Sequence, residues 1–322
     1  IQTNFSKTII MRIALDMMGG DFAPEQACLG VLSFLQVHTD CQLFLLGNQP
    51  IIESLLGEQS NHSCITYIHT EEIIGMDEHP IKAMKEKPNS TLVMGFGLLA
   101  KGAVDVFMSS GNTGVMLVGA SHMIKVIEGV LRPSIPTPVP QIDGTYSIML
   151  DVGINADCKP ENLNQFATLG SIYATEILGI EKPTAALMNI GEEEGKGNIL
   201  AQAAYLLMKE NKQINFIGNI EGRDTVDNKA DVIITDGFTG NIMLKFAESL
   251  YDVIKVKRNI QDEFLDKFNH RLYAGVPILG INKPVIVGHG VSDQVSFLGM
   301  LTMARKMLLT KMNDKIIASF AV

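Results

Sequence analysis

Polar, glycine-rich turns that directly follow apolar, strand-like runs are the feature that most constrains the fold of this chain. The turns lie at residues 17–21, 109–114, 189–198 and 236–241. In an open α/β sheet such turns gather at the carboxyl ends of the strands, where ligands bind. Glycine lets backbone N–H groups approach an anion, and the next helix N-terminus adds positive partial charge. The turns therefore predict a site for a phosphate or a developing oxyanion.

Strand-like and helical segments alternate along the chain. The strand-like runs are residues 12–15, 43–46, 64–68, 104–108, 147–150, 184–188, 214–217, 231–235 and 285–287. The helical patterns are residues 24–37, 81–101, 115–128, 161–178, 198–211, 241–272 and 292–315. The alternation predicts an α/β protein, a doubly wound α/β/α sandwich with a mostly parallel sheet. The proline-rich stretch 132–140 predicts a stiff, extended connection.

The residues that end the strand-like runs are nearly all polar. They are Asp16, Ser109, Asp151, Asn189, Asn219, Asp236 and His289. Each one alone can be explained as a helix N-cap, a position that favours Asp, Asn and Ser. The set as a whole indicates a shared binding site at one edge of the sheet.

Composition narrows the class of protein. The chain has 322 residues, of which 46% are hydrophobic and 19% charged, so it can bury a large core. A net charge of −9 argues against non-specific binding to nucleic acid. The four cysteines form no Cys-x-x-Cys pair, which suits a reducing cytoplasm and predicts neither zinc nor a redox dithiol.

Membrane and export signals are missing from the sequence pattern. The longest apolar stretch, 115–130, is interrupted by His122, Lys125 and Glu128, so it does not predict a transmembrane helix. Residues 1–10 do not resemble a signal peptide. We expect Met11 to be the natural start, with residues 1–10 an upstream extension or an expression remnant.

Several familiar motifs are matched only in part, because the structural context or the spacing that each one requires is missing. Gly95 and Gly97 fit a dinucleotide fingerprint, but they lie inside a helical pattern, which predicts close helix packing instead. Gly191 to Lys196 is one residue too short for a P-loop, and Gly197 stands where the magnesium-binding hydroxyl is needed. The histidines show no metal-ligand spacing, and no acyl-serine elbow is present. We therefore predict no metal and no cofactor.

The remaining motifs resemble one family. Residues 11–24, with Asp16, Gly19, Gly20 and Asp21, look like the amino-terminal signature of the bacterial phosphate acyltransferases. Further matches follow in the family's order at 110–114, 150–155, 189–198, 215–221, 235–241 and 289–293. The resemblance runs from Met11 to the last helix.

This resemblance implies a fold similar to the isocitrate and isopropylmalate dehydrogenases and to phosphotransacetylase. It implies that inorganic phosphate attacks the thioester of acyl-acyl carrier protein, giving acyl phosphate for phospholipid synthesis. It also implies a homodimer in the cytoplasm, with peripheral contact to the inner face of the cell membrane. We expect residues 11–322 to form one large domain with a helical protrusion around 244–273.

The residue types suit this chemistry, because phosphate is its own nucleophile and needs only positioning and oxyanion donors. The residues that we expect to be catalytic are Lys196, Asn112 and Asn241. The residues that we expect to bind phosphate or substrate are Gly19, Gly20, Asp21, Ser110, Gly111, Thr113, Gly114, Asp151, Asn155, Asn189, Gly195, Gly197, Asp236, Gly237, Gly240 and His289. Asp16 and Asp151 would repel phosphate unless they are paired with a lysine or cap a helix.

Two groups of basic residues can each be explained either as an ordinary solvated surface or as part of a functional site. Lys82 and Lys85 share a helix face that is either solvated or turned toward the site. The run 255–258, with Lys267 and Arg271, is either an ordinary charged helix face or a surface for the acidic carrier protein.

Three departures from the family pattern stand out. Glu192 replaces a small hydroxyl residue and adds negative charge near Lys196, and Ala274 replaces a glycine. The helical stretch 244–273 is shorter than in relatives, where it includes membrane-contacting helix. Its apolar stripe, Phe246, Leu250, Val253 and Ile254, is diluted further along by acidic residues.

Other functions stay open on the sequence alone. One is a phosphotransacetylase-like enzyme that uses acyl-coenzyme A. Another is a non-catalytic scaffold that binds carrier protein or membrane. A nicotinamide-dependent decarboxylating dehydrogenase is disfavoured, since an arginine-rich carboxylate site and an acidic metal cluster are missing from the sequence.

Overall fold

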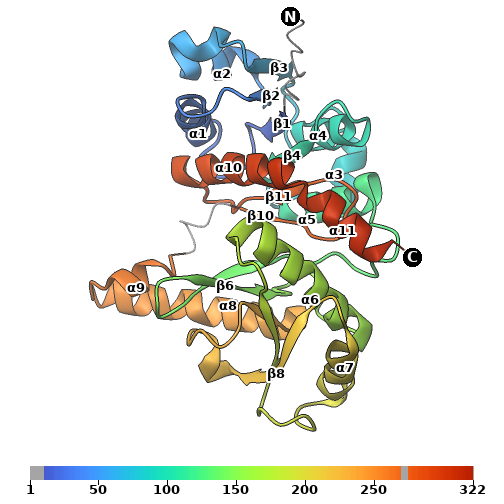
Figure 1. Ribbon diagram of the computed structural model, residues 1–322. Helices are drawn as coiled ribbons and strands as arrows, with labels where there is room; N and C mark the ends of the chain where they lie inside the picture. Colours follow the sequence, from blue (N-terminus) through green and yellow to red (C-terminus); the bar gives the residue numbers. More distant parts are fainter. Residues whose placement is uncertain (1–10, 270–274, 322) are drawn as a thin grey trace, which may run out of the picture.

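A computed structural model describes residues 11–269 and 275–321 and divides the strands between two sheets (Figure 1). The first sheet has the order β10-β11-β4-β1-β2-β3. Its strands are β1 (Met11–Asp16), β2 (Cys41–Gly47), β3 (Ile65–His69), β4 (Val106–Ser109), β10 (Val276–Pro277) and β11 (Val285–Val287). Only β10 pairs antiparallel among the pairings of this sheet in the described chain.

The second sheet has the order β5-β6-β9-β7-β8. Its strands are β5 (Thr137–Pro140), β6 (Tyr146–Leu150), β7 (Thr184–Asn189), β8 (Asn215–Glu221) and β9 (Val232–Ile234). β5 comes from the proline-rich stretch and is an antiparallel edge strand, where a missing N–H donor is tolerated. The predicted α/β class with mostly parallel strands is confirmed, and the division into two sheets is what the sequence pattern did not reveal.

Helices cover both faces of the sheets. They are α1 (Glu25–Leu35), α2 (Gln49–Leu56), α3 (Pro80–Glu86), α4 (Thr91–Ala100), α5 (Thr113–Gly119), α6 (Pro160–Tyr173), α7 (Ile199–Glu210), α8 (Gly237–Tyr251), α9 (Glu263–Asp266), α10 (Gln294–Thr310) and α11 (Met312–Phe320). Turns of π-helix extend α5 over Ala120–Ile124, α6 over Ala174–Leu178 and α8 over Asp252–Lys257. α2 was not predicted.

Three predicted helices are divided in the structure. The pattern 81–101 becomes α3 and α4, because Pro88 disfavours helix at the residue before it. Ser90 then caps α4, its Oγ accepting from the Val93 N–H at 3.4 Å. The pattern 292–315 breaks at Lys311, which has a left-handed φ of 53°. The pattern 241–272 ends as a continuous helix near Lys257, and its last residues, with Arg271 and Ala274, lie outside the described residues.

The largest hydrophobic cluster joins the two sheets. It contains Ile13 and Val106 from the first sheet, Ile148 and Val232 from the second, and Phe297 from α10. Figure 1 shows α10 and α11 (red) crossing the middle of the molecule, where they contact α6 and its π-helical extension. The C-terminal segment therefore ties the second sheet to the first, with α10 also packing against α1 and β1.

The glycine pair on α4 gives a direct test of the packing interpretation. A Cβ on Gly95 would lie 2.1 Å from the fully buried ring of Phe107, whereas a Cβ on Gly97 meets nothing within 4 Å. We expect Gly95→Ala to destabilise the fold by about 1–3 kcal/mol through overpacking. We expect Gly97→Ala to stabilise it by roughly 0.5–1 kcal/mol through helix propensity. Urea denaturation of both variants measures this, and equal effects would contradict the assignment.

Candidate active site

Three loops of the first sheet pack together at the carboxyl ends of adjacent strands. The N–H of Gly288 donates to the carbonyl of Ser109 at 2.8 Å, and the N–H of Asp21 donates to the carbonyl of Gly290 at 2.7 Å. A Cβ on Gly19 would lie 2.6 Å from the backbone nitrogen of Gly111. The structure therefore brings together a first group of predicted site residues, which are Gly19, Gly20, Asp21, Ser110, Gly111 and His289.

Asp16 is the buried anchor of this first group. Its carboxylate accepts from the Ser109 hydroxyl at 2.7 Å and from the Met18 N–H at 3.0 Å. The Ser109 hydroxyl in turn accepts from the Gly111 N–H at 2.8 Å. The expected lysine partner or helix cap is replaced here by local donors. Complete burial raises the pKa of Asp16 above its ordinary value.

The raised pKa predicts an unusual pH dependence of stability. A carboxyl with a raised folded-state pKa stabilises the fold below its ordinary pKa of 3.8, and this contribution is lost as pH rises through the folded-state pKa. Asparagine mimics the neutral form. We therefore expect Asp16→Asn to gain stability relative to wild type as pH rises above the ordinary pKa of 3.8. The gain is about 1.4 kcal/mol for every tenfold tighter proton binding by the folded-state carboxyl.

Asp40 provides a control, because its pKa is shifted in the opposite direction to that of Asp16. The Arg305 guanidinium, 2.6 Å away, lowers the pKa of Asp40. Asp40→Asn should therefore lose stability relative to wild type as pH rises through the lowered folded-state pKa of Asp40 toward its ordinary pKa of 3.8. Urea denaturation at several pH values gives both slopes, and slopes of the same sign would contradict the assignment for Asp16.

Asn112 was predicted to supply a side-chain donor, but both the oxygen and the nitrogen of its amide form hydrogen bonds within the protein. Its Oδ1 accepts from the Val115 N–H at 3.0 Å, which caps α5. Its Nδ2 lies 2.9–3.0 Å from the carbonyl oxygens of Gly75, Met76 and Glu78. The buried amide therefore holds the segment before α3 against α5 in this conformation.

The neighbours of Asn112 differ in their exposure. Thr113 is exposed at the start of α5, whereas a Cβ on Gly114 would lie 2.5 Å from Pro80. α3 packs beside α5, and its residues Lys82 and Lys85 are exposed. Of these groups, the Thr113 hydroxyl and the two lysines remain accessible to a ligand.

The second sheet gathers the other predicted turns at one edge. β6, β9 and β7 are adjacent and parallel, and Leu150, Ile234 and Leu187 are in register at their carboxyl ends. The turns 151–155, 189–198 and 235–241 therefore leave the same edge of the sheet. These turns form the second group, which contains Asp151, Asn155, Asn189, Gly195, Lys196, Gly197, Asp236, Gly237, Gly240 and Asn241.

The loop 151–155 is built around the buried carboxylate of Asp151. The carboxylate accepts from the N–H groups of Val152 at 2.9 Å and Asn155 at 2.6 Å, and from the Asn155 side chain at 3.0 Å. Burial raises its pKa above the ordinary value. Asn155 also donates to the Pro133 carbonyl at 2.8 Å. These buried side chains shape the loop, and Asp151 again has local donors where a lysine or a helix cap was expected.

The N-terminus of α8 packs directly against this loop. The N–H of Gly237 donates to the Asn155 carbonyl at 2.8 Å, and a Cβ on Gly240 would lie 2.0 Å from the Asp151 carbonyl oxygen. Asp236 caps the helix by accepting from the Thr239 N–H at 2.7 Å. Asn241 is exposed one residue beyond the close contact. The arrangement presents an amide side chain at the positive end of a helix.

Lys196 lies on an exposed loop that two asparagines hold in shape. Asn189 donates to the Lys196 carbonyl and to the Asn219 side chain, both at 3.1 Å, and Asn219 donates to the Glu193 carbonyl at 2.9 Å. The Lys196 side chain is 50% exposed, and its Nζ lies 3.9 Å from the Glu193 carboxylate. This loose, exposed pair leaves the ammonium able to turn toward an anion.

Glu192 does not add its charge to Lys196. Its carboxylate pairs with Lys229 at 2.7 Å, and Lys229 also contacts Asp224 at 2.9 Å. Asn219 and Lys229 are therefore supporting residues outside the predicted set. The sequence pattern marked Asn219 as a polar residue at the end of a strand-like run, whereas no sequence pattern pointed to Lys229.

Neither a metal-binding cluster nor a membrane span occurs in the described residues. No cluster of three or more His, Cys, Asp or Glu side chains in 11–269 and 275–321 could hold a metal ion. No helix in the same part of the chain is both long and apolar enough to cross a bilayer.

Comparison with known proteins identifies the family. The family described as "Fatty acid synthesis protein" matches residues 11–315. The phosphate acyltransferase of Dictyoglomus turgidum is 39% identical over 326 residues, covering 95% of this chain and 97% of the relative. The chain belongs to the phosphate acyltransferase family. The Bacillus subtilis member is 36% identical over 316 residues, covering 92% of this chain and 94% of its own.

The family assignment makes this protein an enzyme, a phosphate acyltransferase in fatty acid and lipid synthesis.

Solved structures agree on the fold. A phosphotransacetylase from Streptococcus pyogenes matches with a TM-score of 0.65 and 18% identity, covering 92% of this chain and 94% of that one. A branched-chain phosphotransacylase from Enterococcus faecalis has a TM-score of 0.61 at 15% identity, covering 92% and 99%. The predicted similarity to phosphotransacetylase is confirmed for the fold.

Proposed function

We propose that this enzyme transfers a fatty acyl group from acyl-acyl carrier protein to inorganic phosphate. A phosphate oxygen attacks the thioester carbonyl carbon and forms a tetrahedral intermediate. The C–S bond then breaks, releasing acyl phosphate and the carrier thiolate. A thiolate leaves readily, so His289 as an acid is not required by this scheme.

The observation that carries this proposal is the edge of the second sheet. It presents the loosely held ammonium of Lys196, the exposed amide of Asn241 and the N-terminus of α8 from adjacent parallel strands. A phosphate dianion is favoured by the helix N-terminus and by the lysine point charge. The same donors would stabilise the oxyanion of the tetrahedral intermediate. No acyl-enzyme residue is required, because phosphate itself is the nucleophile.

We assign partners to two surfaces of the α8 region. Phe238 and Ile242 are 62% and 53% exposed and lie four residues apart, so they share one apolar helix face. Exposed apolar faces mark contacts with proteins or membranes, so this face supports the proposed homodimer and the proposed peripheral contact to the inner face of the cell membrane. The location that we propose for the enzyme is the cytoplasm. Lys257 and Arg258 are exposed and form the surface that we assign to the acidic carrier protein, whereas Lys255 pairs with Asp266 at 2.6 Å.

The reaction is tested by release of free carrier thiol from palmitoyl-acyl carrier protein, with and without inorganic phosphate, trapping the product with hydroxylamine. We expect phosphate-dependent release together with a trappable acyl phosphate. Palmitoyl-coenzyme A is run in parallel, because the sequence alone left an acyl-coenzyme A donor open. Release from coenzyme A alone would assign the other donor, and release from neither donor would overturn the proposal.

A further inference from the structure

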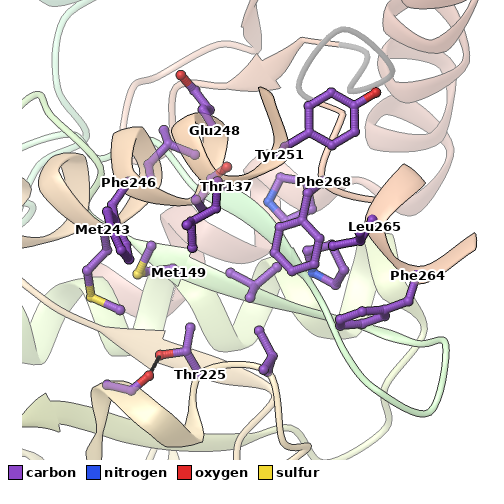
Figure 2. A pocket seen from close by; sticks show the side chains of 18 of the residues that line it. Thr137, Met149, Thr225, Met243, Phe246, Glu248, Tyr251, Phe264, Leu265 and Phe268 are labelled. Carbon is purple, nitrogen blue, oxygen red and sulfur yellow. Dashed lines mark hydrogen bonds between the residues drawn. The ribbon is translucent and has the colours of Figure 1, made fainter. Parts of the chain in front are cut away.

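An apolar cavity lies beside the second sheet, and no residue of the turns 151–155, 189–198 and 236–241 lines it. Its volume is about 380 Å³, within the range of small-molecule sites. One wall comes from β5 and β6, and the other comes from α8 and α9 (Figure 2). Met149, Met243 and Phe246 line one part of it, and Phe264 and Phe268 line another.

The cavity begins where the proposed reaction site ends. Met149 precedes Asp151 by two residues on β6, and Met243 follows Asn241 by two residues on α8. Both walls therefore run directly out of the turns 151–155 and 236–241. From Asn241 to Tyr251, α8 is about 15 Å long at its ordinary rise, a length that suits a long acyl chain better than an acetyl group.

The chemistry of the walls selects an apolar ligand. The lining residues are mostly aliphatic, aromatic and methionine side chains, and methionine adapts its shape to flexible apolar groups. The carboxylate of Glu248 is paired with Lys245 at 2.8 Å, and Figure 2 shows the polar ends of Glu248 and Tyr251 directed away from the other lining side chains. The polar pantetheine arm of a carrier would lose its hydrogen bonds to water here.

We propose that this cavity, between β5–β6 and α8–α9, binds the acyl chain of the thioester donor. The proposal rests on the acyl transfer proposed above. It adds the site that determines which acyl chain lengths the enzyme prefers. The thioester carbon then lies at the N-terminal end of α8, beside Asn241, while the chain runs along the helix toward Phe268. The other possible occupants, a lipid or a second copy of this chain, are outcomes of the test.

The test uses two matched substitutions on α8. Ala247 lines the cavity, whereas Ser249 is exposed and lies outside its lining. We expect Ala247→Phe to lower kcat/KM for palmitoyl-acyl carrier protein by about tenfold or more, because it fills the chain's space. With butyryl-acyl carrier protein kcat/KM should change by less than about twofold. Ser249→Phe should leave both donors unchanged.

Either of two kinetic results would overturn the proposal. One is an unchanged palmitoyl rate in Ala247→Phe, and the other is an equal loss with both donors at an unaltered melting temperature. If Ala247→Phe lowers the melting temperature, Ala247→Leu replaces it, with a smaller shift in chain preference in the same direction. A variant that loses dimerisation or vesicle binding but keeps the wild-type chain preference assigns the cavity to a second copy or a lipid instead.

A binding measurement separates this proposal from the proposed function. The fluorescent fatty acid cis-parinaric acid should bind the wild-type protein and Ser249→Phe, and its affinity for Ala247→Phe should be about tenfold lower. Equal binding to all three proteins would overturn the cavity assignment even if acyl transfer is established. A wild-type protein that binds the probe but produces no acyl phosphate would instead overturn the proposed function alone.

Discussion

Replacing Lys196 with alanine is expected to lower kcat for acyl phosphate formation by about 100- to 1,000-fold, the usual effect of losing one oxyanion donor. The loop that carries Lys196 is held by the hydrogen bonds of Asn189 and Asn219, which do not involve the ammonium group. The loop should therefore keep its shape in the variant. Hydroxylamine trapping at saturating donor and phosphate measures the change, and circular dichroism with a melting curve checks the fold.

The matched control for Lys196 is Lys209→Ala. Lys209 is also exposed and is paired with a carboxylate of the same loop, Glu194, at 2.7 Å. Because exposed pairs contribute little, this variant should keep kcat within about twofold of wild type. If Lys196→Ala and Lys209→Ala behave alike, the ammonium of Lys196 has no special role, and the phosphate site must be sought at the first sheet.

Replacing Gly240 with alanine is expected to have the largest structural effect at the site. The new Cβ would lie 2.0 Å from the Asp151 carbonyl oxygen and 2.9 Å from the Thr235 side chain. The nearest atom is backbone and cannot rotate away, so the N-terminus of α8 must shift. We expect a loss of about 1–3 kcal/mol in the free energy of unfolding. We also expect at least about 100-fold lower kcat/KM, since a displacement of about 1 Å near the chemistry has effects of this size.

Gly97→Ala is the control for this substitution as well. Gly97 is also helical, and a Cβ there meets nothing within 4 Å. It should leave kcat/KM unchanged and raise the melting temperature slightly. Wild-type stability and activity in Gly240→Ala would show that α8 tolerates separation from the loop 151–155, and would contradict the proposed placement of Asn241.

Much of the fold was readable because its signals are local. Continuous apolar runs mark buried parallel strands, and the helical patterns mark the coverings of the sheets. Local patterns were misleading where two signals competed. Residues 81–101 keep a helical pattern across Pro88, and the proline restriction decides the break. Residues 132–140 looked like a connection, yet part of the stretch pairs as the edge strand β5.

The turns that form the candidate site were predicted, but their separation into two groups was not. The sequence identified the turns, whereas the structure places them in two groups, one at each sheet. Asn112 illustrates the gap, because its amide contacts residues 34–37 positions away, and no local pattern reports that. The assignment of catalytic and binding residues therefore stays a prediction, which Lys196→Ala and Gly240→Ala address directly.

The sequence by itself determined the α/β class, the positions of most strands and the polar turns, because periodicity and composition act over neighbouring residues. The tertiary structure alone decided the two sheets, the pairing of Glu192 with Lys229 and the close approach of Gly240 to Asp151. These features depend on contacts between residues far apart in the chain. Such contacts form only when the whole core closes, so their partners cannot be read from any single segment.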